Sequence, residues 1–398
     1  MSRRREPARA TSAETVLASA FDAAAFTATE AIDATGLTRS TVLAACAELV
    51  RLGWLRDLDD ARAAGEEYRK GRPARRYELD AGAGVVVGVD AGQHRVTALV
   101  ADLRGTVLAR AEGALGDAGL EVPVRLGVTA DTVSRALADA GVDPTRVLVT
   151  VIGIPAPVDA SGASPDDGGF WNRMNPGFAD VVPHGVVVVE NDANAAALAE
   201  RPSSGDASFA ALLSGERFGA GLVVDGVLLR GARGGAGELR VLDLVDGVAS
   251  SDGIGRTART LVRQARAAGR VGASSLLGGD EEPDAAAVLT AAALGDAVAV
   301  GIVDALGDRL ARVCVLLASL LDIDRVVVAG AIADAVEPVI DRARAHLAAW
   351  EYDPTPEVVA SRLGGDVVVL GALALALDTV RADPMAFPLP AAQPVPAT

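Results

Sequence analysis

Four acidic and amide side chains lie in contexts that suit the binding of hydroxyl groups: Asn175, Asn191, Asp192 and Glu238. Carboxylates and amides form paired hydrogen bonds with hydroxyls, and a sugar is a ring of hydroxyls. These residues are therefore candidates for contact with a hydroxyl-rich ligand such as a sugar. An alternative for Asn191 and Asp192 is a strand-to-helix cap, because Asn and Asp favour helix N-termini, and both roles can hold at once.

A second group of polar residues suits contact with DNA. The sequence around Gly36 has helix-turn-helix form, because the glycine breaks a short helix at a left-handed corner. The next helix begins with four polar residues, Thr38, Arg39, Ser40 and Thr41. Hydroxyl and guanidinium groups read phosphates and base edges when such a helix enters the major groove. A small structural helical bundle is the alternative.

A basic segment follows that helix. Residues 69–76 hold five cations and no anion. Lys70, Gly71 and Arg72, followed by a proline, would form a narrow extended turn, and Arg72 can enter an electronegative minor groove. Arg75 adds a further cation next to it. The segment is typical of the DNA-contacting wing of a winged helix.

The distribution of charge supports contact with DNA at one end of the chain. The 398 residues carry a formal net charge of −16, yet residues 1–80 hold 13 basic and 13 acidic residues. The remainder therefore carries the whole negative excess. A local basic patch on an acidic body suits a protein that touches DNA with one domain.

The composition also limits the class of protein. Hydrophobic residues make up 50% of the chain and aromatic residues 3%, so a large core must be built from Ala, Val and Leu. No apolar run is long enough for a membrane-spanning helix, and the basic N-terminus has no apolar run behind it, as a secretory signal would. Cys46 and Cys314 lie in apolar helical patterns, and we expect buried free thiols in a reducing cytoplasm.

The elements that would position these residues follow from apolar periodicity. Three helices are predicted over residues 13–56, the third from Thr38 to about Arg51, followed by strands near 54–55 and 77–79, which is the order of a winged helix. From Val85 onward β-branched runs alternate with helical patterns, which predicts an α/β fold. The predicted strands lie at 85–89, 96–101, 107–109, 147–152, 186–189, 209–213, 221–224 and 325–329, and the predicted helices near 125–140, 193–200 and 296–320.

Motifs after residue 85 resemble those of the ROK family, which groups repressors, open reading frames and sugar kinases. They begin at Asp90 (Asp-Ala-Gly-Gln-His), Gly153 (Gly-Ile-Pro-Ala-Pro), Asn175 (Asn-Pro-Gly-Phe), Glu190 (Glu-Asn-Asp-Ala-Asn), Arg230 (Arg-Gly-Ala-Arg-Gly-Gly-Ala-Gly-Glu-Leu) and Asp324 (Asp-Arg-Val-Val-Val-Ala-Gly-Ala). The resemblance covers nearly the whole chain and implies a two-lobed fold of the actin-like ATPase type. The expected organisation is a disordered arm (1–12), a winged helix-turn-helix (13–80), a ROK sugar-kinase-like sensor (81–381) with lobes divided near residue 200, and a Pro- and Ala-rich tail (382–398).

The resemblance also implies roles for single residues. In kinases of the family the aspartate equivalent to Asp192 removes a proton from the attacking hydroxyl, as a general base. Asp246 falls at the place of the family's second sugar-binding glutamate. An exposed loop aspartate is the alternative for Asp246.

The chain departs from the family's kinases in the loops that hold ATP. Gln93 and His94 replace a Gly-Thr pair, and Ala331 replaces a glycine. Glu216 places a carboxylate where a phosphoryl group would lie, which is repulsive unless Arg217 or Mg²⁺ compensates. The remnants of the two phosphate loops are Asp90, Gly92, Gly215 and Gly219. We therefore expect no nucleotide cofactor.

The family's structural zinc site is also altered. Val241 stands where a zinc-binding histidine is usual, and neither cysteine of the chain lies nearby. A structural zinc ion needs four nitrogen or sulfur ligands. We therefore expect no bound metal.

These observations predict a DNA-binding transcriptional repressor of carbohydrate metabolism, with a sugar or sugar phosphate as effector in a degenerate kinase cleft and no enzymatic activity. One alternative is an active ATP-dependent sugar kinase that also carries a DNA-binding domain. Another is a repressor with an empty cleft, controlled by a protein partner or by nothing. Since such proteins bind palindromes, a homodimer or homotetramer is expected.

Overall fold

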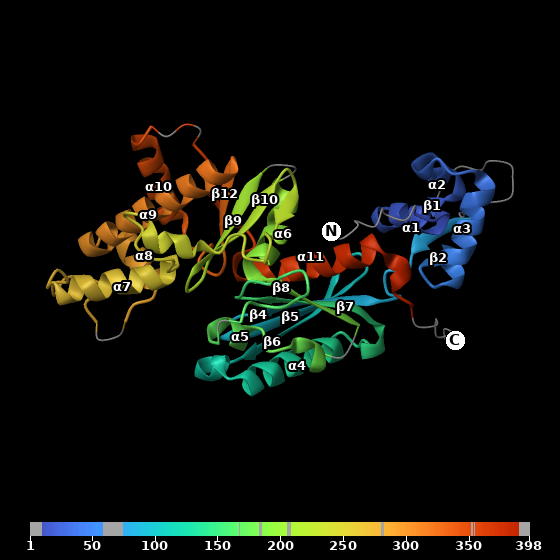
Figure 1. Cartoon of the computed structure of the whole chain (residues 1–398), viewed down its shortest axis with the longest axis horizontal. Helices are drawn as coiled ribbons and strands as arrows, with labels where there is room; N and C mark the ends of the chain where they lie inside the picture. The colour runs from blue at the N-terminus through green and yellow to red at the C-terminus, as the bar shows by residue number, and fades with distance from the viewer. Residues whose placement is uncertain are drawn as a thin grey trace.

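The computed structural model describes residues 10–58, 75–166, 168–182, 185–204, 208–279, 282–351, 353 and 355–389. Figure 1 shows three parts: an N-terminal unit (blue), a first lobe (cyan to green) and a second lobe (mainly yellow to orange). The N-terminal unit and the second lobe lie at opposite sides of the picture, and the first lobe lies between them.

The N-terminal unit consists of three helices and a small antiparallel sheet. The helices are α1 (Ser12–Asp22), α2 (Ala28–Thr35) and α3 (Arg39–Arg51), and the strands, β1 (Phe26–Thr27), β2 (Leu55–Leu58) and β3 (Arg76–Leu79), lie in the order β1-β3-β2. The side chains of Val42, Cys46 and Leu49 on α3 are buried. The three helices and the two longer strands lie where the sequence predicts them, and the two-residue strand β1 is an addition.

Local sequence fixes where these helices begin and end. Thr11 and Thr27 each form a capping box with the glutamate three residues later, at the starts of α1 and α2. Gly36 ends α2 with φ of 68°, a left-handed conformation that glycine adopts without steric cost. Thr38 caps α3 through its hydroxyl oxygen, which accepts a hydrogen bond from the amide of Thr41.

The first lobe is built on a mixed five-stranded sheet in the order β6-β5-β4-β7-β8. Strands β4, β7 and β8 are parallel to their neighbours in that group, whereas β5 and β6 are antiparallel additions. Helix α4 packs on one face and α11 on the other. The bounds are β4 (Val85–Ala91), β5 (Arg95–Asp102), β6 (Val107–Ala114), β7 (Val147–Ile154), β8 (Val186–Asn191), α4 (Val122–Asp139), α5 (Phe170–Met174) and α11 (Val367–Ala382).

The second lobe has a mixed sheet in the order β11-β10-β9-β12-β13. Four helices, α7 to α10, share an apolar cluster on one face of this sheet, and α6 packs on the other face. The bounds are β9 (Phe209–Ser214), β10 (Phe218–Val224), β11 (Val227–Leu229), β12 (Arg325–Ala329), β13 (Glu357–Ala360), α6 (Asp192–Ser204), α7 (Ile254–Ala267), α8 (Ala285–Ala293), α9 (Ala297–Leu321) and α10 (Glu337–Ala349).

Helices α6 and α11 connect the two lobes. Helix α6 follows the last strand of the first sheet but packs on the second sheet, and α11 follows the second sheet but packs on the first. The two helices touch closely: a Cβ atom added at Gly371 would lie 1.7 Å from the backbone oxygen of Ala195. Only glycine fits this contact, so the two helices cannot take any larger side chain there without moving apart.

The N-terminal unit shares an apolar cluster with the first lobe and with α11. Arg104, in the β5–β6 turn, donates hydrogen bonds to the backbone oxygens of Phe21, Ala23 and Ala24 at 3.4, 2.8 and 3.3 Å. A cation at the C-terminal end of α1 also interacts favourably with the helix dipole. Arg381 of α11 lies over the Phe21 ring, with 5.2 Å between the guanidinium carbon and the ring centroid. The unit is therefore docked on the lobe by both polar and apolar contacts.

The structure confirms the α/β fold and each predicted strand and helix of the two lobes, with shifted ends. The sequence interpretation omitted α5, α7, α8, α10, α11, β11 and β13. Part of the expected arm and tail is ordered: α1 begins at Ser12, Pro384–Ala386 forms a 3-10 turn, and Phe387 is buried in the shared cluster. The prolines of this segment did not prevent packing, because Phe387 and Leu389 supply apolar surface. Residues 1–9 and 390–398 lie outside the described residues.

Among the described residues no single helix is both long and apolar enough to cross a membrane, and only the sharply bent pair α8 and α9 meets those criteria jointly.

Candidate functional site

Three carboxylates meet at the junction of the two lobes. Asp90 lies near the C-terminal end of β4, Asp192 begins α6 directly after β8, and Glu238 precedes a 3-10 turn, η5 (Leu239–Leu244). Strands β4, β7 and β8 are parallel, so Asp90 and Asp192 lie at the same edge of the sheet, where ligands commonly bind in α/β proteins. The electrostatic influence of Asp90 and Glu238 on Asp192 confirms that the three groups are neighbours.

Burial and mutual repulsion hold these carboxyls in an unusual ionisation range. Burial, and then the charges of Asp90 and Glu238, raise the pKa of Asp192 to about 8. Burial raises the pKa of Asp90 to about 7, against the opposing charges of Arg95 and Arg125. Burial also raises the pKa of Glu238. Near neutral pH a protonated carboxyl at this place can donate a hydrogen bond to a hydroxyl, and an ionised one can accept.

Arg125 of α4 is a fully buried cation behind Asp90. Its guanidinium donates to the backbone oxygens of Ala91, Gly92 (2.8 Å) and Met174 (3.3 Å) and lies 5.9 Å from the ring centroid of Phe178. It therefore joins the first phosphate loop to the end of α5. Sequence interpretation missed Arg125; an arginine on the apolar face of a helix was the available signal.

Asn191 acts as a helix cap, as the alternative interpretation allowed. Its side-chain oxygen accepts from the amide of Asn194 at 3.0 Å, and its side-chain nitrogen donates to the backbone oxygen of Ala156 at 3.1 Å. Asp192 accepts from the amide of Ala193 at 2.8 Å and remains partly exposed. Asp192 is thus the member of the pair with surface available to a ligand.

Glu190 ties the two lobes together beside Asn191. Arg230, which follows β11 of the second lobe, donates to one carboxylate oxygen of Glu190 at 3.0 and 2.7 Å. The other oxygen accepts from the amide of Asn191 at 3.0 Å and from the side chain of Asn194 at 2.9 Å. The Glu190 side chain is only 5% exposed and that of Arg230 is 43% exposed, so the carboxylate is shielded from water and the guanidinium is not.

The other two expected sugar contacts differ in placement. Asn175 ends α5, and its side-chain nitrogen donates to the backbone oxygen of Gly162 and to the Ser164 hydroxyl, both at 3.0 Å, so only its oxygen could accept from a ligand. Asp246 is exposed, and the pKa of Arg312 on α9 is raised mainly by the hydrogen bond to Asp308 and to a smaller extent by the charge of Asp246. This placement agrees with the alternative interpretation of Asp246 as an exposed loop residue.

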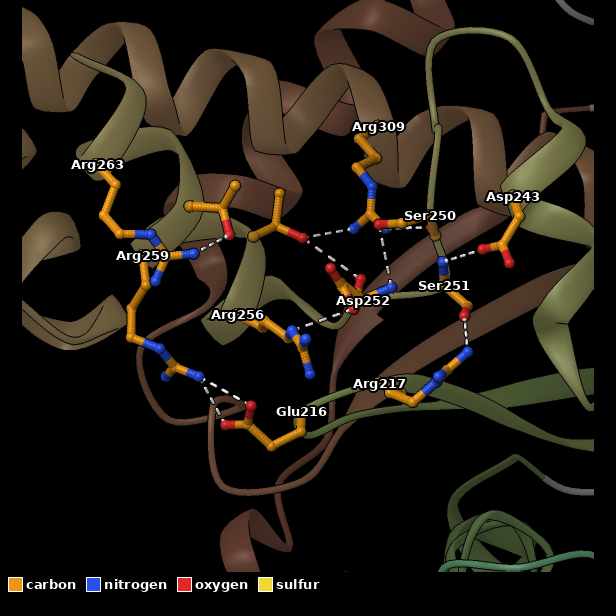
Figure 2. A network of polar contacts seen from close by, with 12 residues as sticks. Glu216, Arg217, Asp243, Ser250, Ser251, Asp252, Arg256, Arg259, Arg263 and Arg309 are labelled. Atoms are coloured by element: carbon orange, nitrogen blue, oxygen red, sulfur yellow. Dashed lines mark hydrogen bonds and ion pairs between the residues drawn. The ribbon is translucent and has the colours of Figure 1, made fainter. Parts of the chain in front are cut away.

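The second phosphate loop is the β9–β10 turn, residues 215–217, and it contains an internal ion pair. Glu216 binds Arg259 of α7, with both carboxylate oxygens 2.8 and 2.9 Å from one guanidinium nitrogen (Figure 2). Glu216 is therefore paired with Arg259, and Arg217, which the sequence offered as a possible compensating cation, is not its partner. Arg217 points instead to the hydroxyl of Ser251.

The segment before α7 braces this loop. Gly253 donates to the backbone oxygen of Glu216 at 2.9 Å, and Phe218 donates to that of Ser251 at 2.8 Å. Asp243 accepts from the amide of Ser251 at 3.0 Å, and the buried Arg309 of α9 binds Ser250 (Figure 2). The loop is thus part of a continuous polar network, and a triphosphate would have to compete with Glu216 for Arg259.

The first phosphate loop is closely packed as well. Arg125 holds the oxygens of Ala91 and Gly92, and a Cβ atom at Gly119 would lie 2.1 Å from the backbone oxygen of Gln93. Gly215 and Gly219 remain in the second loop, where Gly219 forms a β-bridge with Glu238. Two cavities of about 310 Å³ each lie along α7 and α9, and neither is lined by the three carboxylates.

Within the part of the chain that the structure describes, no group of three His, Cys, Asp or Glu residues could hold a metal ion. Val241 is exposed, and Cys46 and Cys314 are buried in separate apolar clusters. The residues present therefore do not fit the family's zinc site.

The expected DNA-contacting residues of α3 lie on an exposed helix start. Arg39 and Ser40 are exposed, and the Thr38 hydroxyl lies 3.1 Å from that of Ser40 and 2.8 Å from that of Thr41. Arg75 is also exposed and lies 3.4 Å from the Asp57 carboxylate. The remaining expected contacts, Lys70, Gly71 and Arg72, lie outside the described residues.

Solved structures share this fold. A ROK family transcriptional regulator, described as a homologue of the E. coli MLC protein, superposes with a TM-score of 0.70 at 19% identity over 92% of this chain and 97% of its own, which shows the fold alone. A ROK family glucokinase from Streptomyces griseus, in complex with glucose and AMPPNP, has a TM-score of 0.58 at 28% identity over 74% of this chain and 100% of its own. Both a regulator and a kinase are thus similar to this chain.

Sequence comparison gives the family. The bifunctional enzyme NanE/NanK of Brucella suis biovar 1 is 31% identical over 227 residues, 53% of this chain, but this chain spans only 41% of that protein's length. A model of the ROK family matches residues 86–379, which is most of the chain. The chain therefore belongs to the ROK family.

Proposed function

We propose that this protein is a DNA-binding transcriptional regulator, a repressor, whose DNA affinity depends on a sugar or sugar phosphate bound between the two lobes. The observation that carries the proposal is the docking of the N-terminal unit on the lobe that holds Asp90 and whose strand β8 leads directly into Asp192. Two ligand sites on one packed body can influence each other through a coupling free energy.

The N-terminal unit supports the DNA-binding half of the proposal. Its order of three helices and a following hairpin matches a winged helix-turn-helix, and α3 presents Arg39 and Ser40 to solvent. The basic segment 69–76, of which the structure describes only Arg75 and Arg76, is proposed as the wing. The partner is double-stranded DNA with a palindromic operator, which suits a homodimer or homotetramer. The protein is proposed to act in the cytoplasm.

The structure of the second phosphate loop supports a sensor rather than an enzyme. Arg259 of α7 is held by Glu216 of the second phosphate loop (Figure 2), and the segment before α7 braces that loop. Binding a sugar needs Asp192, Glu238 and Asn175, whereas phosphoryl transfer also needs both loops open to ATP. We propose that no zinc, nucleotide or other cofactor is required. Elemental analysis that found stoichiometric zinc in the purified chain would contradict the zinc part.

The second candidate function is an ATP-dependent sugar kinase that also binds DNA. The raised pKa of Asp192, about 8, favours it, because a general base works best with a pKa near the working pH. A repressor with an empty site remains the third candidate.

One pair of measurements separates the three candidates. A thermal-shift screen of the full chain against neutral sugars and sugar phosphates should raise the melting temperature if a ligand binds the folded state. An ATP-consumption assay with the sugars that bind should show no turnover. Turnover that disappears in Asp192→Asn would identify a kinase, and no shift with any sugar would identify a repressor with an empty site.

Asp192→Asn tests the effector site itself. Removing one hydrogen-bonding partner that the protein offers a bound ligand typically costs about 1–3 kcal/mol, so sugar binding should weaken roughly tenfold or more. DNA affinity without sugar should stay within about twofold, since Asp192 does not belong to the N-terminal unit. Calorimetry and a DNA-binding assay on the same preparations check both expectations.

A further inference from the structure

Two arginines of the second lobe flank Glu238. Arg217 lies in the β9–β10 turn, and Arg240 follows Glu238 by two residues. The β-bridge between Gly219 and Glu238, and the hydrogen bond of 3.1 Å from the Ala220 amide to the Gly237 oxygen, hold the two segments side by side. Both guanidinium charges counter the rise in the pKa of Glu238, so both lie close to that carboxylate.

Unlike three nearby arginines, Arg217 and Arg240 form no salt bridge with any of the described residues. Arg230 pairs with Glu190, Arg256 with Asp252 and Arg259 with Glu216. Arg217 instead binds the neutral hydroxyl of Ser251. Arg217 and Arg240 are both exposed at the lobe junction.

Arg240 is fixed in a geometry that suits anion binding. Its guanidinium carbon lies 5.7 Å from the ring centroid of Trp171, which belongs to α5 of the first lobe and lies one turn before Asn175. A guanidinium held over an aromatic face keeps the N–H groups along its edge free, and this planar fork matches a carboxylate or phosphate. The contact also spans the two lobes.

We propose that the effector of this protein is an anionic sugar, a phosphate ester or a sugar acid, whose charged group is bound by Arg217 and Arg240 while its ring hydroxyls meet Asp192 and Glu238. This inference rests on the proposed function and gives its ligand a chemical class. An anionic ligand would meet little repulsion from Asp90 and Asp192, because their raised pKa values leave both carboxyls partly protonated near neutral pH.

The test is calorimetric titration of the full chain with matched probes. Glucose, galactose, mannose and N-acetylmannosamine are each compared with the 6-phosphate, and the three hexoses also with the uronic acid. For at least one sugar the anionic form should bind about tenfold to hundredfold more tightly than the neutral form, as expected for charge-assisted hydrogen bonds. The advantage should shrink as salt is raised from about 50 to 200 mM. The phosphate and uronic acid arms identify which anion is preferred.

Arg217→Gln and Arg240→Gln should each reduce binding of the anionic form by about tenfold. Arg270→Gln is the matched control, since it removes one exposed charge of the same lobe without touching Glu238. The inference fails if a neutral sugar binds as tightly as its anionic form, or if both glutamine variants retain full affinity for the anion. In the first case the proposed sugar sensor survives with a different ligand. If no probe binds the wild-type chain, the sugar site of the proposed function fails together with this inference.

Discussion

Burial has a measurable effect on the ionisation of single side chains at the lobe junction. Asp192 has a pKa of about 8 instead of 3.8, so the folded chain binds this proton more tightly than the unfolded chain does. The stabilisation from this proton is complete below the pKa that Asp192 has in the unfolded chain. It is lost as the pH rises through the pKa that Asp192 has in the folded chain. The free energy of unfolding should therefore fall between about pH 4 and pH 8 through this group.

We predict that Asp192→Asn stabilises the chain more at about pH 9 than at about pH 5. Asparagine keeps the shape of the side chain and removes the carboxyl that must ionise at the lobe junction. Urea unfolding at both pH values measures the difference. Asp131→Asn, which removes an exposed carboxylate on α4, controls for the loss of one negative charge. An equal effect of Asp192→Asn at both pH values would show that this carboxyl titrates normally.

A second residue-scale prediction concerns the ion pair between the lobes. Arg230→Gln should lower the free energy of unfolding by about 1–3 kcal/mol, because it leaves one oxygen of the buried Glu190 carboxylate without a charged partner. The double variant with Glu190→Gln should recover part of this loss. Arg233→Gln, an exposed arginine three residues later, is the control. Additive losses in the double variant would show that the two side chains are not coupled.

At the scale of elements, local sequence signals located most helices and strands of the structure. Capping residues and Gly36 marked the ends of α2 and α3, and valine runs marked β4, β7 and β8. Helix α7 is rich in arginine, and the sequence interpretation overlooked its narrow apolar stripe, in which Ile254, Ala258, Val262 and Ala265 recur at helical spacing and are buried. Helix α11 was missed because it is almost wholly apolar: it is packed between the first sheet, α6 and the N-terminal unit, so no polar face shows its period.

The residues of the candidate site were likewise predicted only in part from the sequence. The sequence located Asp192, Glu238 and Asn175 through motifs, because each is recognisable from its immediate neighbours. The cations Arg125, Arg230 and Arg259 could not be located so, because they contact Gly92, Glu190 and Glu216 from distant segments of the chain. Sequence interpretation considered only Arg217 as a side chain that could compensate Glu216, because it is the neighbour in sequence, whereas the partner in space is Arg259.

The start of α3 allows an element-scale prediction. Arg39→Gln should weaken binding to a DNA duplex selected by the wild-type chain, and should reduce the salt dependence of binding by about one ion. Arg51→Gln changes the same charge at the other end of the helix, where Arg51 pairs with Glu48, and should have a smaller effect. Filter-binding titrations at several salt concentrations measure both. If the two variants behave alike, α3 does not enter the groove by its N-terminal end.

At the scale of the whole molecule, the N-terminal unit and the effector site are joined through the first lobe. Helix α11 begins near the lobe junction, where the charge of Asp366 acts on Asp90, and ends against the N-terminal unit, where Arg381 covers Phe21. Helix α6, which begins with Asp192, crosses α11 at the tight contact of Gly371 with Ala195. A change at the lobe junction therefore has a packed route to the unit proposed to bind DNA.

Arg104 forms polar contacts between the first lobe and the N-terminal unit, at the end of this route. Its removal tests whether the docking of the unit couples the two sites. Arg104→Ala deletes three hydrogen bonds to the C-terminal end of α1 but leaves the effector site and α3 intact. We expect faster hydrogen exchange in α1 and unchanged exchange in α4, because the unit then keeps only its apolar contacts and those of Arg381 with Phe21 and Asp22. The ratio of DNA affinities with and without the sugar that binds best should move toward one, since the coupling depends on the docked state. Arg135→Ala is the control, because Arg135 also donates to a backbone oxygen, that of Glu112, on the opposite face of the lobe. Unchanged exchange in α1 would show that the hydrogen bonds of Arg104 are not needed for docking. Faster exchange with an unchanged ratio of DNA affinities would show that the two sites are coupled by another route.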